Sequence, residues 1–183
     1  KRLPASEDGQ APRLAIVGTG DPAFGDPVLL ARYDHSVDGL VKQWVTAAQK
    51  TGRDHFDTLL VDDRIFDRKF VHPDWPRKQL IHHYCAQVAG INFHENVLHV
   101  MPIPADERGQ APTIRLYPSP SSLEVTNRAT TGARGIFTKD RRLGTNHLIF
   151  RGAVREKPSA PYKLTFHDPP MFFAQVLADR LKE

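Results

Sequence analysis

Leu14-Ala-Ile-Val17 and Thr58-Leu-Leu-Val61 are two short apolar runs, and they flank a helical pattern that extends from Val37 to Lys50. Gly18 ends the first run, and Asp62-Asp63 ends the second. In the segment between the runs, apolar residues recur every three to four positions, which is the pattern of an amphipathic helix. A strand, a helix and a strand in this order predict a βαβ unit.

Further along the chain, the spacing of apolar residues changes to two, which is the period of a strand. A short helical stretch at about Arg77–Tyr84 comes first, and Asn96 is then expected to form a tight turn between two strands. Short strands separated by Gly, Pro and Asn predict a small antiparallel β-domain. The alternating residues are Ile91, Phe93 and Glu95, then Val97, His99 and Met101, then Ile114 and Leu116, and finally Leu148, Phe150 and Ala153-Val154.

The last segment of the sequence returns to a helical pattern. Asp168 precedes Pro169-Pro170, an arrangement typical of an N-cap followed by proline in the first turn. The apolar face of this predicted helix consists of Phe172, Phe173, Val176, Leu177 and Leu181. Such a face must be buried against another element.

Five short sequence islands carry a resemblance to a known family. In their order and at their intervals, they resemble the middle of the low-molecular-mass class C penicillin-binding proteins, the D-alanyl-D-alanine carboxypeptidase/endopeptidase family. The resemblance extends from about Leu14 to Lys182. The islands are Gly18-Thr-Gly-Asp-Pro22, Val61-Asp-Asp-Arg-Ile-Phe66, Asn92-Phe-His-Glu-Asn96, Asn127-Arg-Ala-Thr-Thr131 and His167-Asp-Pro-Pro170.

This resemblance implies a fold class of α/β plus all-β. The final helix would return to the first part of the chain, so that a discontinuous α/β domain, a sheet flanked by helices, contains a small antiparallel β-domain nested in it. The expected ranges are 1–93 for the first part of the α/β domain, 94–163 for the nested β-domain and 164–183 for the returning part.

The catalytic motifs of penicillin-binding proteins are absent from the sequence. Acyl transfer in these proteins uses Ser-x-x-Lys, then Ser-x-Asn, then Lys-Thr-Gly. None of the six serines has lysine three residues later or asparagine two residues later. Lys50-Thr51-Gly52 matches the third motif, but it closes the predicted helix, which Ser36 or Asp38 can cap at its start. We therefore interpret this triplet as a helix end.

The resemblance implies that the chain is an insert-domain fragment of a serine-type D-Ala-D-Ala carboxypeptidase/endopeptidase. The parent would act on peptidoglycan in the periplasm or another extracytoplasmic space, without a cofactor, and the insert would guide or restrict access of the substrate. Within the chain we assign no catalytic, cofactor-binding or metal-binding residue, and we expect the fragment to be inactive alone. A parent that has lost its catalytic residues stays open.

An alternative function is a stand-alone module that binds a glycan or a protein without catalysis. Trp75, Tyr84 and exposed histidines would then be its contact residues. The sequence on either side of the chain distinguishes the two functions, because the enzyme requires Ser-x-x-Lys before Lys1 and Ser-x-Asn after Glu183.

Three other patterns have plainer interpretations. His82-His83, and the pair His94 and His99, lack the convergent spacing of a helical zinc motif. Gly18-Thr-Gly20 precedes Asp21-Pro22, which brings a negative charge and removes an N–H group, so we expect a structural turn and no phosphate loop. Asp62-Asp63 is expected to bind loop N–H groups at the end of a strand. Core or interdomain packing is expected for the aromatic residues Trp75, Phe93, Phe172 and Phe173.

Composition excludes some classes of protein. The net charge is only +4, and Arg68-Lys69 and Arg141-Arg142 each follow an aspartate, so we expect solvated surfaces of mixed charge and no nucleic-acid partner. The single cysteine, Cys85, permits no intramolecular disulfide. No apolar run is long enough to cross a membrane. The sequence does not indicate an oligomeric state.

Overall fold

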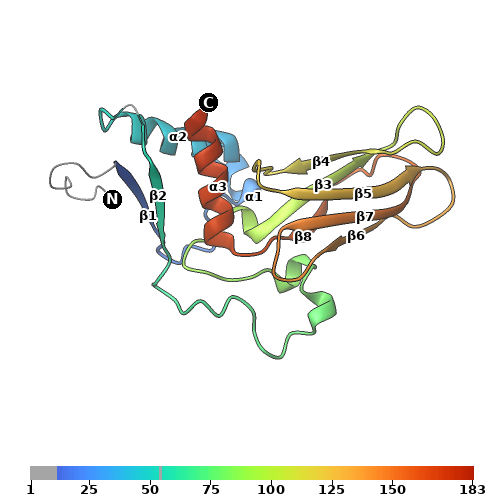
Figure 1. The fold of residues 1–183 in the computed structure, drawn as a ribbon, viewed down its shortest axis with the longest axis horizontal. Coiled ribbons are helices and arrows are strands. Elements are labelled where there is room, and N and C mark those ends of the chain that lie inside the picture. Colours follow the sequence, from blue (N-terminus) through green and yellow to red (C-terminus); the bar gives the residue numbers. More distant parts are fainter. Residues whose placement is uncertain (1–11, 54) are drawn as a thin grey trace. The chain divides into compact units, whose positions relative to one another are not determined.

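The structure is a computed structural model, and it describes residues 12–53 and 55–183 (Figure 1). The chain divides into two compact units. Unit 1 contains the described residues up to Phe70, together with Val88–Glu95 and Asp168–Glu183. Unit 2 contains Val71–Gln87 and Asn96–His167.

Unit 1 contains the predicted βαβ arrangement. Strands β1 (Arg13–Val17) and β2 (Thr58–Asp62) pair in parallel, from Arg13 opposite Thr58 to Val17 opposite Asp62. Between them lie the short helix α1 (Pro27–Ala31) and the longer helix α2 (Val37–Gln49). The Ser36 hydroxyl caps α2 by accepting a hydrogen bond from the Gly39 amide, at 3.0 Å. The strand, helix and strand predicted from residues 14–61 are therefore confirmed.

The C-terminal helix α3 (Pro169–Lys182) belongs to unit 1 and packs against α2 and β2. The carboxylate of Asp168 accepts a hydrogen bond from the Met171 amide at 3.2 Å, which confirms the predicted N-cap. Pro169 and Pro170 occupy the first turn. Four residues of the predicted apolar face, Phe172, Phe173, Val176 and Leu177, are buried, and the fifth, Leu181, is half-buried.

An aromatic cluster forms the centre of unit 1. The Phe173 ring lies 5.0 Å from Phe24, 5.4 Å from Trp44 and 4.8 Å from Phe93, measured between ring centroids. Such edge-to-face and tilted contacts are favourable for aromatic pairs. Because the four rings come from three separate segments of the chain, the cluster joins the end of unit 1 to its beginning.

A charged contact also joins the distant parts of unit 1. The guanidinium of Arg68 donates hydrogen bonds to both carboxylate oxygens of Asp63, at 2.8 and 2.9 Å, and to Asp168 Oδ2 at 3.2 Å. Asp63 is buried. Paired with two carboxylates, the positive charge of Arg68 is neutralised locally.

Unit 2 consists mainly of two three-stranded sheets. One sheet has the order β4-β3-β8, with β3 (Val97–Ile103) between β4 (Thr113–Tyr117) and β8 (Tyr162–Thr165), and both pairs are antiparallel. The other has the order β5-β7-β6, formed by β5 (Glu124–Thr131), β7 (His147–Val154) and β6 (Thr138–Arg141). The expected fold class, an α/β part and a separate β part, is confirmed.

One strand pair differs from the expected antiparallel arrangement. β6 and β7 form an antiparallel pair, but β5 pairs with the other edge of β7 in parallel. β7 is therefore the central strand, with β6 on one edge and β5 on the other. The second sheet is therefore mixed.

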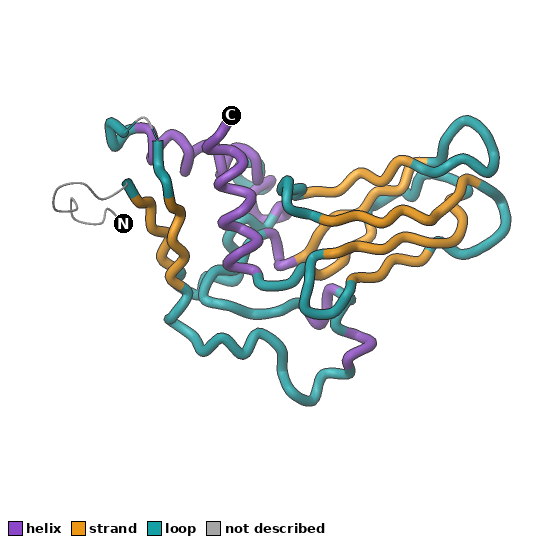
Figure 2. Tube along the Cα trace, viewed as in Figure 1, coloured by secondary structure: helices purple, strands orange, loops and turns teal. Residues whose placement is uncertain are grey.

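Two predictions about the segment between β2 and β3 are wrong. Residues 91–95 form no strand, and at the end of this segment His94, Glu95 and Asn96 have positive φ values of 54°, 57° and 56° in a short turn η3 (His94–Asn96). Residues 77–84 form two 3₁₀ turns, η1 (Arg77–Gln79) and η2 (His83–Cys85), in place of one helical stretch. Figure 2 shows that this segment is mostly loop.

The predicted domain boundaries 1–93, 94–163 and 164–183 stay a prediction about independent folding. The structure places residues 71–87 with unit 2, whereas the sequence assigned them to the α/β part. Among the described residues, no helix combines the length and the apolar character that a membrane span requires.

Candidate functional site

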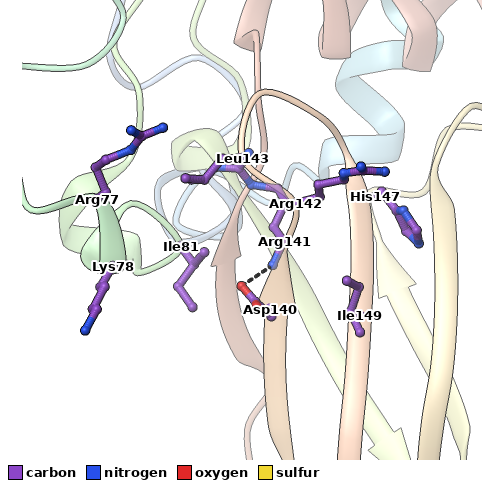
Figure 3. A pocket seen from close by; sticks show the side chains of 9 residues that line it. All are labelled: Arg77, Lys78, Ile81, Asp140, Arg141, Arg142, Leu143, His147 and Ile149. Carbon is purple, nitrogen blue, oxygen red and sulfur yellow. Dashed lines mark hydrogen bonds between the residues drawn. The ribbon is translucent and has the colours of Figure 1, made fainter.

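A pocket of about 470 Å³ in unit 2 is a candidate binding site (Figure 3). One wall comes from the segment that contains η1, and the other comes from the hairpin of β6 and β7. Ile81, Leu143 and Ile149 supply apolar surface. The polar lining residues are Arg77, Lys78, Asp140, Arg141, Arg142 and His147.

The Arg141 side chain forms hydrogen bonds with both walls of the pocket. This residue is 3% exposed, and its Nε donates a hydrogen bond to the Thr165 carbonyl at 2.9 Å. Its Nη1 donates to the Thr145 carbonyl at 3.0 Å, and its Nη2 donates to the Leu80 carbonyl at 3.4 Å. Leu80 precedes a stretch that lies along β8, where the Thr165 amide donates to the Ile81 carbonyl at 3.1 Å.

The guanidinium of Arg141 is a buried charge whose hydrogen bonds go to uncharged oxygens. Burial lowers the pKa of Arg141 to about 10, and the nearby negative charge of Asp140 opposes that shift. The side chain therefore stays cationic at neutral pH. The Asp140 carboxylate accepts a hydrogen bond from the Arg141 backbone amide at 2.8 Å, so it caps the strand end instead of pairing with the guanidinium.

Three exposed cations surround the pocket. Among the residues that the structure describes, Arg77, Lys78 and Arg142 form no ion pair. Arg142 begins the turn between β6 and β7, which is closed by a hydrogen bond from its amide to the His147 carbonyl at 3.0 Å. The His147 ring contacts the Thr126 hydroxyl, with 2.7 Å between Nε2 and Oγ1. The pocket is therefore lined by positively charged side chains, and hydrogen bonds hold the hairpin that carries Arg142.

Comparison with known proteins identifies the family. Residues 5–183 match the sequence profile of the D-Ala-D-Ala carboxypeptidase 3 (S13) family. The chain belongs to the S13 family. This result confirms the resemblance derived from the five sequence islands. No curated protein matches the sequence.

Solved structures agree with the S13 assignment at the level of the fold. Penicillin binding protein 4 (dacB) from Haemophilus influenzae is similar with a TM-score of 0.61 and 12% identity, over 93% of this chain and 36% of that one. The same protein complexed with a novel beta-lactam gives a TM-score of 0.51 and 13% identity, over 93% of this chain and 33% of that one. The chain thus spans about a third of the length of these structures.

The Lys-Thr-Gly triplet of this S13 chain ends a helix, as the sequence predicted. α2 ends at Gln49, Lys50 is its C-cap, and the Thr51 hydroxyl donates a hydrogen bond to the Ala48 carbonyl at 2.7 Å. Gly52 has a φ of 72° and lies two residues beyond the cap. Ser36 is used as the N-cap of the same helix. Ser36 and Lys50 therefore have structural roles as the N-cap and the C-cap of α2.

The glycine-rich segment forms a structural turn. A side chain at Gly18 would collide with the Gly90 carbonyl, and the amides of Gly18 and Gly20 donate hydrogen bonds to the carbonyls of Asp62 and Gly90, both at 2.8 Å. The next helix, α1, is capped by the Asp26 carboxylate, which accepts hydrogen bonds from the Val28 and Leu29 amides. These contacts agree with the predicted turn.

The two aspartates after β2 have different partners. The Asp62 carboxylate accepts a hydrogen bond from the Arg64 backbone amide at 3.3 Å, as expected for a strand end. It also accepts a hydrogen bond from the Arg64 guanidinium at 2.7 Å. The side-chain hydrogen bond from Arg64 lowers the pKa of Asp62 to about 2. Asp63 binds Arg68 instead of a loop amide, so the expectation of N–H binding is wrong for that residue.

The histidines and aromatic residues considered in the sequence do not converge on one site. His94 is buried, His99 is half-buried, and no group of three potential metal ligands occurs within the described part of the chain. Phe93, Phe172 and Phe173 are buried in unit 1 as predicted, whereas Trp75 is half-buried in unit 2. Tyr84 is 59% exposed.

Sequence reasoning missed the cationic pocket. Arg141-Arg142 was predicted to be a solvated pair, and this is wrong for Arg141, which is buried. The available signal was the position of Arg141 at the end of a strand, just before a turn. The other wall lies more than 50 residues away in sequence, and local periodicity contains no information about such a contact.

Proposed function

We propose that the chain is the noncatalytic insert of a serine-type D-Ala-D-Ala carboxypeptidase/endopeptidase and that it guides or restricts access of peptidoglycan. The observation that carries this proposal is the S13 match over residues 5–183 of a sequence that contains no Ser-x-x-Lys. A serine without an adjacent base is a weak nucleophile. We therefore assign the catalytic residues to other parts of the parent protein.

The same proposal covers the parent. It would cleave the terminal D-Ala, or a cross-link made through D-Ala, by an acyl-enzyme route without a cofactor. Its substrate implies a periplasmic or other extracytoplasmic location at the cell wall. The similarity to penicillin binding protein 4 over about a third of that protein supports the parent's architecture.

Binding energy explains how an insert without chemistry affects the reaction. Contacts with remote, nonreacting parts of a large substrate can contribute to the transition state, while a small substrate cannot use them. We therefore expect the insert to influence cleavage of intact peptidoglycan more than reaction with a penicillin.

The experiment removes unit 2 from the parent and compares these two substrates. Phe70 and Val88 can be rejoined closely, because the Val88 amide donates a hydrogen bond to the Phe70 carbonyl at 3.2 Å. Residues 71–87 and 96–167 would each be replaced by a short Gly/Ser linker. We expect penicillin acylation to persist and peptidoglycan cleavage to change. Equal peptidoglycan cleavage would reject the guiding role, and loss of both reactions would indicate misfolding.

A stand-alone binding module is the second candidate. It is favoured by one observation: the exposed Tyr84 ring stacks on His82, with centroids 5.3 Å apart and 14° between the planes. Such a platform suits the apolar face of a sugar. Reading the flanking sequence separates the candidates, since a module requires neither Ser-x-x-Lys before the chain nor Ser-x-Asn after it.

A further inference from the structure

We propose that the cationic pocket of unit 2 binds the free carboxylate of a peptide that carries small aliphatic side chains. The pocket brings together four cations, from Arg77, Lys78, Arg141 and Arg142, with one carboxylate, from Asp140. The net charge of the whole chain is only +4. This concentration of positive charge therefore exceeds what an average surface of the protein would show.

The buried guanidinium of Arg141 forms no ion pair with another described residue, and Asp140 is the one carboxylate among the lining residues of the pocket. Burying a charged group is unfavourable unless it is paired or well hydrogen-bonded. Arg141 is bonded to the carbonyls of Thr165, Thr145 and Leu80, and none of these carries a negative charge. An anion in the pocket would be attracted by Arg141 and by the surrounding exposed cations.

Arginine geometry favours a carboxylate as that anion. The planar guanidinium offers parallel N–H donors that match the two oxygens of a carboxylate. Arg77 and Arg142 belong to opposite walls of the pocket (Figure 3), and their side chains form no hydrogen bond or ion pair with another described residue. Both are exposed and have donors available for a ligand.

The apolar lining indicates what accompanies the carboxylate. Ile81, Leu143 and Ile149 lie beside the cations. A methyl group next to a carboxylate would cover this surface, and a D-alanine terminus has that chemistry. This choice of peptide rests on the proposed function, but the charge of the pocket does not depend on it.

The experiment titrates the isotopically labelled 183-residue chain with acetyl-D-Ala-D-Ala and follows its backbone amides by NMR. We expect saturable shifts at Ile81, Arg142, Leu143 and His147, with a dissociation constant of roughly millimolar size. The C-terminal amide of the same dipeptide lacks the carboxylate and should produce no such shifts. Shifts confined to other residues, equal shifts with the amide, or no shifts would overturn the proposal.

Matched variants test the role of charge at this site. Arg142→Gln should weaken binding by about five- to tenfold, because one charge-assisted contact is lost. Arg155→Gln removes the same charge from an exposed position of unit 2 outside the pocket and should leave binding unchanged. Equal affinity for inorganic phosphate, or equal weakening by both substitutions, would show general anion attraction and overturn the assignment to a peptide.

These outcomes are separable from those of the proposed function. If removal of unit 2 alters peptidoglycan cleavage but the pocket does not bind the dipeptide, the guiding role stands and the pocket assignment fails. If the pocket binds the dipeptide but removal of unit 2 has no effect, the pocket assignment stands and the guiding role fails.

Discussion

Each unit contains an arginine that forms hydrogen bonds with buried groups, Arg68 in unit 1 and Arg141 in unit 2. The two differ in whether a carboxylate neutralises the positive charge. In unit 1, Arg68 lies between the carboxylates of Asp63 and Asp168, so its charge is neutralised where it joins distant segments. In unit 2, Arg141 makes its hydrogen bonds to carbonyl and hydroxyl oxygens. The first arrangement suits a scaffold. We propose that the second arrangement leaves a positive charge available to attract a ligand.

The largest expected effect comes from removing the returning helix of unit 1. We propose that the segments of unit 1, which come from the beginning, the middle and the end of the chain, fold as one domain. Ending the chain after His167 would remove α3 and the buried side chains of Phe172, Phe173 and Leu177. We expect unit 1 to lose its cooperative unfolding transition, measured by circular dichroism during heating. A chain shortened by only Leu181–Glu183 is the control, and an unchanged transition after the larger truncation would break the proposed domain.

A single substitution tests the aromatic cluster of unit 1. Phe173→Ala should lower the free energy of unfolding by about 3–5 kcal/mol, because the side chain is buried against three other rings. Urea denaturation followed by tryptophan fluorescence measures the change. Met171→Ala, on an exposed position of the same helix, should have an effect within about 0.5 kcal/mol. Similar costs for the two variants would contradict the packing described.

The corresponding test in unit 2 is Arg141→Met. This substitution should lower the free energy of unfolding by about 1–3 kcal/mol, because buried carbonyl groups lose their donors. Arg142→Met removes the same charge from an exposed side chain and serves as the control. If Arg141→Met stabilised the chain, the hydrogen bonds would be worth less than the cost of burying the charge, and the comparison between the units would need revision.

A smaller effect is expected from the titration of Asp62 in unit 1. Its pKa is lowered from 3.8 to about 2, chiefly by the side-chain hydrogen bond from Arg64. Because the folded pKa lies below the unfolded value, the contribution to stability is present above about pH 4 and is lost as the pH falls toward 2. NMR titration of the carboxylate should show a pKa that rises from about 2 toward 3.8 in Arg64→Ala, because this variant loses the guanidinium and keeps the backbone amide. An unchanged low pKa would reject this cause.

The same contrast explains how far sequence reasoning could reach. Leu14–Val17, Val37–Lys50 and the apolar face after Asp168 have strong periodicity, and the structure contains the predicted elements in unit 1. Residues 91–95 also alternate in sequence, but residues 91–94 are all buried and residues 94 and 95 have positive φ, so the alternation does not correspond to the two faces of a strand. β5 was missed because most of its residues are exposed and polar, so that it has no apolar period.

The pocket was harder to predict from the sequence than the fold. Arg141 and Arg142 are adjacent in sequence, yet one is buried and one is exposed. That difference depends on carbonyl groups at Leu80 and Thr165, which are 61 and 24 residues away. Local patterns cannot specify such partners. The family resemblance, by contrast, depends on short islands in register, and these were visible in the sequence.

Labelling with a fluorescent penicillin tests the central claim that this S13 chain contains no acyl-transfer chemistry of its own. The 183-residue chain would be incubated with the probe beside an active S13 carboxypeptidase as the positive control, and covalent adducts would be separated on a denaturing gel. We predict no stable adduct, because no serine of the sequence has the lysine that would activate it. A stoichiometric adduct that forms on the folded chain, and that does not form when the chain is denatured before labelling, would contradict the account.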